Sequence, residues 1–256
     1  MSKNELRHFW ELLWSMTEKE LQVRYKHTIF GFLWLIANPL LQMLIIGFIF
    51  PLFVKEPITH YSYYLFTGLL AWNFFFLSLS KATPSIVNER SLIKKSVFPR
   101  MVIPLSIILS NLVNYFAAFL LFLIPLFFLN TLSVNSIPYL LIAYCLLLIF
   151  TAGISLLTSA LNVRFRDINF FVQALLIIWF YATPIVYSLS QIPPRLLWLW
   201  RFNPLTSILQ LMQHALVGAA LPGPAMLLSN ILVILLIMIL GILVFRTESR
   251  NFDDWL

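Results

Sequence analysis

Charged side chains are scarce in this sequence, since only 11% of its 256 residues are Asp, Glu, Lys or Arg. Soluble domains usually carry about a quarter charged residues. Here 61% of the residues are hydrophobic, and the mean hydropathy is +0.89. This composition excludes an ordinary soluble domain and indicates a membrane protein with several spans. We therefore do not read the net charge of +7 as a nucleic-acid footprint, and we expect no nucleic-acid partner.

Reactive side chains are also few. The single cysteine, Cys145, excludes an internal disulfide and leaves the redox compartment undetermined. The four histidines, His8, His27, His60 and His214, are not paired at metal-ligand spacing, so we expect no metal site. No glycine precedes Lys-Ser or Lys-Thr, so the phosphate-binding loop of ATPases is absent. If this protein moves a substrate uphill, the energy comes from another chain.

Six apolar runs are long enough to cross a bilayer, which takes roughly 20 residues of helix. They cover approximately 29–54, 61–79, 101–129, 138–161, 170–187 and 225–245. None of them contains an ionisable side chain, and proton- or ion-coupled carriers usually need such groups within their spans. The sequence therefore predicts an all-α polytopic membrane protein that is not a carrier of this kind.

A seventh apolar region, 205–221, is short for a span and carries Gln210, Gln213 and His214. Such a segment more often re-enters the membrane from one side, packed against protein. We therefore expect a re-entrant hairpin on the outer side, between spans five and six.

The distribution of basic residues supports this count, because cytoplasmic flanks are enriched in Lys and Arg. With six spans, one side of the membrane receives fourteen of the 17 basic residues. They are Lys3, Arg7, Lys19, Arg24, Lys26, Lys81, Arg90, Lys94, Lys95, Arg100, Arg164, Arg166, Arg246 and Arg250. The other side receives only Lys55, Arg195 and Arg201. Six spans with both termini in the cytoplasm follow.

Residues 1–28 form a separate unit, followed by one transmembrane domain over 29–256. Its apolar side chains share one helical stripe and its polar ones lie opposite. The stripe consists of Leu6, Phe9, Trp10, Leu13, Trp14, Thr17 and Leu21. The Trp pair favours a helix lying in the membrane interface. An amphipathic helix packed on a cytoplasmic partner is the alternative.

The stretch "NERSLIKKSVFPR", residues 88–100, gathers five charged side chains between two spans. Leu92, Ile93 and Val97 can share one face of a short helix, which Pro99 ends. Such a helix on the cytoplasmic side suits docking of an energy-supplying subunit. A loop that is basic only to set topology remains the alternative.

Four segments together resemble a known family. They are "VRYKHTIFGFLWLIANPLLQ" at 23–42, "LNVRFRDINFF" at 161–171, "YATPIVYSLSQIPP" at 181–194 and "RFNPLTSILQL" at 201–211. The chain resembles the permease subunits of ABC transporters that export polysaccharides, including O-antigen, teichoic acid and capsule.

This resemblance implies a homodimer in the bacterial cytoplasmic (inner) membrane, paired with two ATPase subunits that hold the ATP and Mg²⁺. No cofactor is expected on this chain, and the cargo is a lipid-linked glycan. The coupling helix between spans two and three would contain Arg90, Leu92, Ile93, Lys94, Lys95 and Val97. The loop with Arg164, Arg166 and Asp167 would make the second ATPase contact. The N-terminal helix would lie along the inner leaflet, and 196–221 would form the outer mouth.

Aromatic side chains, 16% of the residues, offer stacking surfaces for sugar rings along the expected path. The candidates are Trp34, Trp72, Trp179, Phe180 and Tyr181. Because spans one and five line the channel in similar exporters, Trp34, Trp179 and Tyr181 are the strongest candidates for the substrate path. Aromatic residues also pack against lipid and neighbouring helices, which is the competing interpretation of each one.

Other functions stay open at this stage. A permease for teichoic acid, capsule, a lipid or a drug has the same general composition. A membrane-embedded glycosyltransferase or polymerase normally needs charged residues on its outer face for sugar phosphates. That face offers only Lys55, Glu56, Arg195 and Arg201, so we expect a transporter subunit without enzymatic activity.

Overall fold

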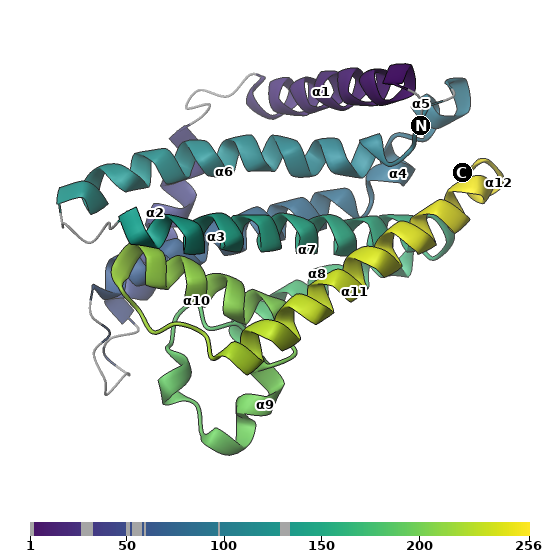
Figure 1. Ribbon diagram of the computed structural model, residues 1–256. Helices are drawn as coiled ribbons and strands as arrows, with labels where there is room; N and C mark the ends of the chain where they lie inside the picture. Colours follow the sequence, from purple (N-terminus) through teal and green to yellow (C-terminus); the bar gives the residue numbers. More distant parts are fainter. Residues whose placement is uncertain are drawn as a thin grey trace.

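The computed structural model describes residues 3–26, 33–49, 52, 58, 60–96, 98–128 and 134–256. Every regular element within these ranges is helical (Figure 1). Short 3₁₀ turns connect the helices at Val134–Ser136, Leu189–Gln191, Pro194–Leu196 and Ser249–Asn251. The all-helical class expected from the sequence is thus confirmed for the described residues.

Four helices of the described part are long and apolar enough to cross a membrane. They are α3 (Tyr61–Ala82), α6 (Val102–Phe128), α7 (Ile137–Arg164) and α11 (Pro224–Glu248). Each overlaps one of the apolar runs of the sequence, because an uninterrupted apolar run can satisfy its backbone in lipid only as a helix. The chain is therefore a multi-pass membrane protein.

Two further apolar helices are shorter. Helix α2 (Trp34–Ile49) has 16 residues and α8 (Asp167–Tyr181) has 15. At 1.5 Å per residue they reach about 24 and 22 Å, whereas the hydrocarbon core is about 30 Å thick. Part of the first apolar run, 29–54, lies outside the described residues. The count of six spans consequently stays a prediction.

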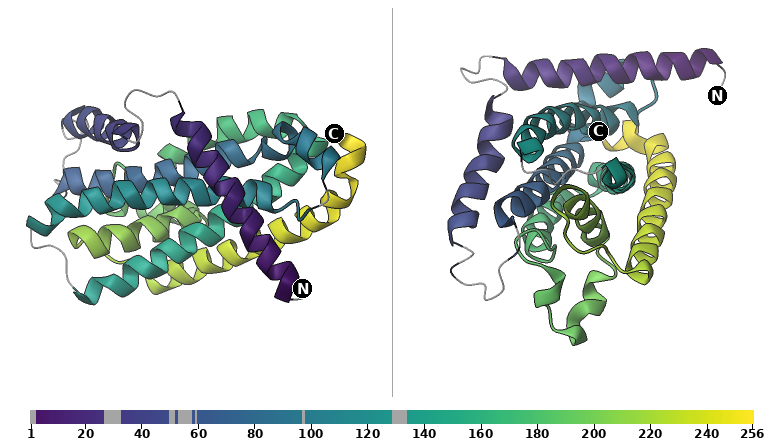
Figure 2. Two further views of the ribbon diagram at one scale, coloured as in Figure 1. Left: turned by 90° about the horizontal axis from the view of Figure 1, so that it is seen from above. Right: turned by 60° about the vertical axis from the view of Figure 1, so that its left-hand side comes forward.

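The region after α8 contains α9 (Leu197–Trp200) and α10 (Pro204–Val217). Helix α10 is almost wholly buried and packs against α3, α7 and α11. It ends at Gly218, whose φ of 70° lies in the left-handed region that glycine tolerates. Helix α9 projects from the bundle, as Figure 1 and the right view of Figure 2 show. That α10 re-enters the membrane stays a prediction.

Helices α7 and α11 form the most extensive helix pair, and two glycines set their closest approach. A Cβ atom built on Gly241 would lie 2.2 Å from the carbonyl oxygen of Gly153. A Cβ on Gly153 would lie 2.7 Å from the Cα of Met238. Small residues permit such contact between backbones, which is a common way to join helices in lipid.

Helix α1 (Lys3–Tyr25) crosses α6 on the outside of the bundle (Figure 2, left). Its apolar stripe divides between two environments. Leu13 and Thr17 are buried, whereas Trp10 and Trp14 are 59% and 66% exposed. The inner half of the stripe therefore packs on the bundle, and the tryptophans stay free for a bilayer surface.

Candidate functional site

The segments expected to contact an ATPase gather at one end of the bundle. Helices α4 (Ser85–Asn88), α5 (Arg90–Lys95) and α12 (Phe252–Trp255) lie together there with the C-terminus (Figure 1). The junction of α7 and α8 joins them, because Arg164 contacts α12. We call this region, made of α4, α5, α12 and residues 164–167, the basic end.

The charged residues of helix α5 point outward, and one apolar side chain packs into the bundle. Ile93 is 4% exposed, and Leu92 is half-buried. The charged residues Arg90, Lys94 and Lys95 are all exposed. Val97 lies outside the described residues. The residues of the expected apolar face therefore do not share one environment. Ile93 is buried in the chain's own core, whereas Leu92 is only half-buried.

That core is a small cluster separate from the main one. Ile93 packs there with Ile86 of α4, Ile103 of α6, Val163 of α7 and Phe252 of α12. With Phe245 of α11, six helices of the described part contribute to this cluster. Because packed interiors have little free volume, we expect a displacement of α5 to be felt by the other helices of this cluster, α6 and α7 among them.

The second expected contact, the loop between α7 and α8, is exposed at Arg164, Arg166 and Asp167. The Arg164 guanidinium lies over two rings, 5.1 Å from the centroid of Phe165 and 5.4 Å from that of Trp255. Cation–π contacts of this kind orient the guanidinium while leaving its N–H groups available for other partners. The loop is thereby connected to α12.

Sequence reasoning did not find the C-terminal contacts of the basic end. Arg100, at the start of α6, forms an ion pair with Asp253 and donates a hydrogen bond to the Ser249 carbonyl. It also lies 5.8 Å from the ring centroid of Phe252, which is fully buried. Helix α12 therefore bridges the segment after α5 and the loop after α7. The local signal was the pair of acidic residues between two aromatic ones in "NFDDWL".

A further contact joins α1 to the basic end. Lys19 Nζ and Glu89 Oε1 are 2.8 Å apart, and Glu89 is the residue directly before α5. Because α1 is expected at the membrane surface, this ion pair ties that surface to α5. The basic end as a whole is rich in exposed cations and suits an acidic protein surface. Among the described residues no group of His, Cys, Asp and Glu could hold a metal ion.

The aromatic candidates for a substrate path fall into different environments. Tyr181 and Trp34 are exposed, at 69% and 48%, whereas Trp72 is buried. Ring contacts link Trp72 to Phe180 at 5.4 Å and Phe180 to Tyr181 at 5.2 Å. The structure thus brings Trp72, Phe180 and Tyr181 together along α3 and α8. Of the three rings, that of Tyr181 is the exposed one.

Trp179 faces the protein interior. Its ring packs edge-on against Phe75 at 5.3 Å and Phe150 at 5.8 Å. Its indole Nε1 donates to Asn203 Oδ1 at 2.9 Å. The contacts of Trp179 are therefore with the chain's own core and with the segment that begins α10.

Asn203 is a site residue that sequence reasoning missed. Its amide donates to the Ala182 carbonyl and to Thr183 Oγ1, both at 3.0 Å. Its Oδ1 also accepts from the Leu205 N–H and caps α10. The Asn-Pro sequence at 203–204 is a recognised helix start and was the available signal. Asn203 joins the end of α8 to the start of α10.

Two tyrosines of α3 hold the connection between α8 and α9. Tyr61 donates to the Val186 carbonyl at 3.0 Å, and Tyr64 donates to the Tyr187 carbonyl at 3.1 Å. The apolar run continues to 187, but α8 ends at Tyr181, and the following residues, which include Pro184, turn and bond to α3.

Comparisons with known proteins agree with this arrangement. Residues 11–217 match the sequence model of the family described as ABC-2 type transporter. The chain is 38% identical over 211 residues to the O-antigen export system permease protein RfbA of Klebsiella pneumoniae, covering 81% of this chain and 80% of that protein. It is 32% identical over 237 residues to the protein of the same name from Myxococcus xanthus, covering 91% of each.

Proposed function

Because this chain belongs to the ABC-2 type transporter family, we propose that it is the permease that exports lipid-linked O-antigen across the cytoplasmic membrane. The observation that carries the proposal is the similarity over 91% of the chain to a protein named as an O-antigen export permease. Family membership makes the chain a transporter membrane subunit and not an enzyme, and it implies an ABC ATPase as partner. ATP and Mg²⁺ bind that partner in the proposed assembly.

The proposed assembly contains two copies of this chain and two ATPase subunits in a bacterial inner membrane. The exposed apolar faces of α2 and α8 support a second copy, since Leu44, Phe48, Ile177 and Ile178 are at least 61% exposed. Lipid covers whatever part of these faces the second copy does not. The lipid-linked glycan moves between the copies.

The proposed topology has six spans, with α2 and α8 completed by neighbouring residues and by tilting or thinning of the bilayer. Both termini lie in the cytoplasm, where the basic end meets the ATPase. Residues 1–28 are the interface helix, and residues 29–256 form one permease domain. Helix α10 re-enters from the outer side, which its burial among α3, α7 and α11 supports.

In this proposal the exposed side chains of α5 contact the ATPase. They are Arg90, Lys94 and Lys95, with Leu92 and Val97 supplying apolar contact. Arg164, Arg166 and Asp167 make the second contact. Ile93 does not contact the ATPase in this proposal. It holds α5 in place, because it is buried in the small core together with residues of α6, α7 and α12. ATP-driven movement at α5 therefore reaches the spans through packed side chains.

The path for the glycan is proposed along α2 and α8 of both copies. Tyr181 and Trp34 offer exposed rings for stacking on sugars, and Trp72 and Phe180 support Tyr181 from behind. Trp179 holds the outer hairpin through Asn203. Weak stacking of sugars on aromatic rings, without fixed charges in the path, suits a glycan polymer that has to move along it.

Inside-out membrane vesicles that contain this chain and its ATPase test the function. Radiolabelled lipid-linked O-antigen should become inaccessible to external glycosidase when ATP is added, and a labelled lipid without glycan should not move. Vesicles with a hydrolysis-deficient ATPase supply the control. Movement of the bare lipid at an equal rate would make the protein a lipid exporter and refute the polysaccharide assignment.

Cysteine labelling tests the topology separately, in a Cys145→Ser background because Cys145 is exposed. Cysteines placed at Ser91 and Asn251 should react only with reagents that reach the cytoplasm. A cysteine at Ser190 should react from outside. Labelling of Ser190 and Asn251 from the same side would contradict six spans.

A further inference from the structure

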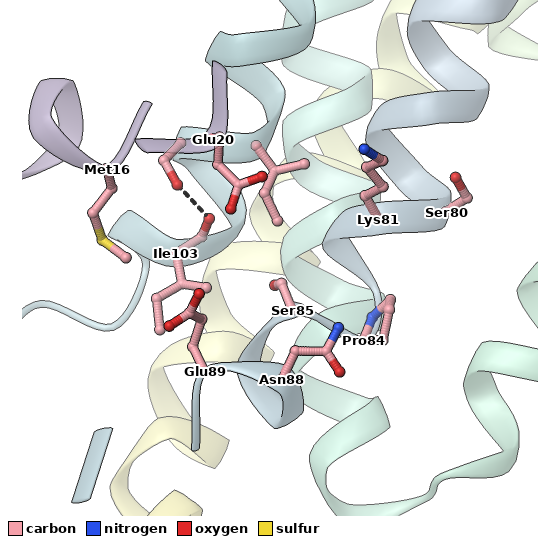
Figure 3. A pocket seen from close by; sticks show the side chains of 11 residues that line it. Met16, Glu20, Ser80, Lys81, Pro84, Ser85, Asn88, Glu89 and Ile103 are labelled. Atoms are coloured by element: carbon pink, nitrogen blue, oxygen red, sulfur yellow. Dashed lines mark hydrogen bonds between the residues drawn. The ribbon is translucent and has the colours of Figure 1, made fainter. Parts of the chain in front are cut away.

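A cavity of about 300 Å³ opens beside the basic end, between α1, the end of α3, α4 and the start of α6 (Figure 3). Its volume lies at the lower end of the range of small-molecule sites, about 300–1,000 Å³. One wall is apolar and consists of Met16, Ile103 and Ile107. The other walls carry the ionisable residues Glu20, Lys81 and Glu89.

Glu20 of α1 and Lys81 of α3 come from different helices that border this cavity. Figure 3 places Glu20 and Lys81 on opposite walls. Lys81 lies within electrostatic reach of both Glu20 and Arg24, yet none of the three joins an ion pair in the part of the chain that the structure describes. Glu89, in contrast, is already paired with Lys19.

Arg24 is the most unusual of these groups. Its guanidinium nitrogens Nε and Nη2 are buried, and neither has a hydrogen-bond partner among the described residues. Buried polar groups are nearly always hydrogen-bonded, and an unpaired buried cation is costly. Arg24 follows Glu20 by one helical turn and so lies on the same face of α1. Arg24 does not line the cavity, but its charge lies within reach of Lys81, which does, so this corner of the cavity is cationic.

A suitable ligand therefore has an anionic group for this corner, a cationic group for the Glu20 carboxylate, and an apolar portion for Met16, Ile103 and Ile107. The position is consistent with a lipid, since α1 exposes Trp10 and Trp14, which favour the bilayer surface. A purely anionic lipid would leave Glu20 uncompensated. A quaternary ammonium has no N–H to donate to Glu20.

We propose that this cavity binds the headgroup of a zwitterionic aminophospholipid, with its phosphate at Lys81 and its primary ammonium at Glu20. The site is distinct from the glycan path and requires only that the basic end lie at a bilayer surface. A bound headgroup would stabilise the junction of α1 with α4 and α5, because Glu89 borders both the cavity and α5.

Native mass spectrometry of the delipidated full chain, titrated with one phospholipid at a time, tests the site. Phosphatidylethanolamine should bind about tenfold more tightly than phosphatidylglycerol or phosphatidylcholine, as expected for one charge-assisted hydrogen bond. Glu20→Gln should abolish this preference while phosphatidylglycerol binds as before or better. Lys81→Gln should weaken binding of all three lipids.

Arg7→Gln is the matched control, because Arg7 lies on the same helix but its side chain is 82% exposed. It should bind all three lipids as the wild type does, and equal melting temperatures establish that each variant is folded. Equal affinity of the wild type for all three lipids would overturn the proposal, as would unchanged preference in Glu20→Gln. Displacement of the lipid by millimolar inorganic phosphate would also overturn it, since the site would then bind a free anion.

Glycan export by the same variants is measured separately, so that loss of export without loss of lipid binding tests only the transport function.

Discussion

Arg100 and Asp253, 153 positions apart, form an ion pair that fastens α12 to the start of α6. The neighbouring Phe252 lies under the Arg100 guanidinium and fills the small core that also holds Ile93. The C-terminal turn is thereby part of the same packed unit as α5. Two substitutions separate the contribution of its charge from that of its ring.

We expect Asp253→Asn to be mild. The Asp253 carboxylate is 56% exposed, and exposed ion pairs contribute about 0.2–1 kcal/mol. Phe252→Ala should destabilise by about 3–5 kcal/mol, since it opens a cavity beneath Arg100 and beside Ile93. Thermal unfolding of the purified permease in detergent measures both. If Asp253→Asn loses as much stability as Phe252→Ala, the ion pair contributes as much as the ring, and the expected order of the two contributions is wrong.

The glycine contact of α7 and α11 gives a second prediction. Gly241→Ala places a methyl group against the backbone of Gly153, which a rotamer change cannot relieve. Overpacking of this kind costs about 1–3 kcal/mol, and the two spans should separate slightly. Gly223→Ala is the control, because a Cβ there meets nothing within 4 Å. The melting temperatures should fall for Gly241→Ala only, and a stable Gly241→Ala protein would show that the two helices are free to shift apart.

A third prediction concerns the hydrogen bonds of Asn203. Asn203→Ala removes the cap of α10 and the bonds to Ala182 and Thr183, for a loss of about 1–3 kcal/mol. Trp179→Phe keeps an aromatic ring and removes only one bond, so it should lose less.

Reactivity of a cysteine introduced at Ser190 reports how firmly the outer hairpin is held. It should rise several-fold in Asn203→Ala and change little in Trp179→Phe. The reverse order would mean that Trp179, and not Asn203, fixes this region.

The four long helices could be predicted from the sequence almost to their ends. The run 138–161 corresponds to Ile137–Arg164, and 225–245 to Pro224–Glu248. Proline at one end and arginine near the other marked these boundaries, and the absence of charge fixed the interior. The apolar stripe of α1 was also visible, because it depends only on local periodicity.

The remaining features depend on partners distant in the chain, which no local pattern contains. Pro184 marks the end of α8 locally, but the contacts of Tyr61 and Tyr64 with the residues beyond it could not be read from the sequence. Ile93 and Leu92 looked equivalent in sequence, yet only Ile93 belongs to the small core that also contains Phe252. Of the candidate path residues, Trp179 and Tyr181 are two positions apart on α8 and therefore point to different sides, one inward and one outward.

The difference between Leu92 and Ile93 supports the last prediction, which concerns coupling to the ATPase. Ile93→Asp would bury a carboxylate in an apolar core that has no partner for it, so the permease itself should be destabilised. Leu92 is only half-buried and lies on α5, where the ATPase is proposed to dock. Leu92→Asp should therefore leave the permease folded and weaken the complex by about 1.5–3 kcal/mol, the contribution of a fully buried leucine. Lys94→Ala, a loss of one exposed charge, should cost about 0.2–1 kcal/mol at most.

Co-purification of the ATPase, normalised to permease in the membrane, distinguishes these outcomes. Leu92→Asp should lose most of its ATPase and its export at normal expression and melting temperature. Ile93→Asp should lose expression or thermal stability first, and Ile93→Val should behave as the wild type within about 0.5–1.5 kcal/mol. Lys94→Ala should keep its ATPase. If Leu92→Asp retains the ATPase and exports normally, α5 does not dock the partner, and its basic residues serve only to set the topology of the chain.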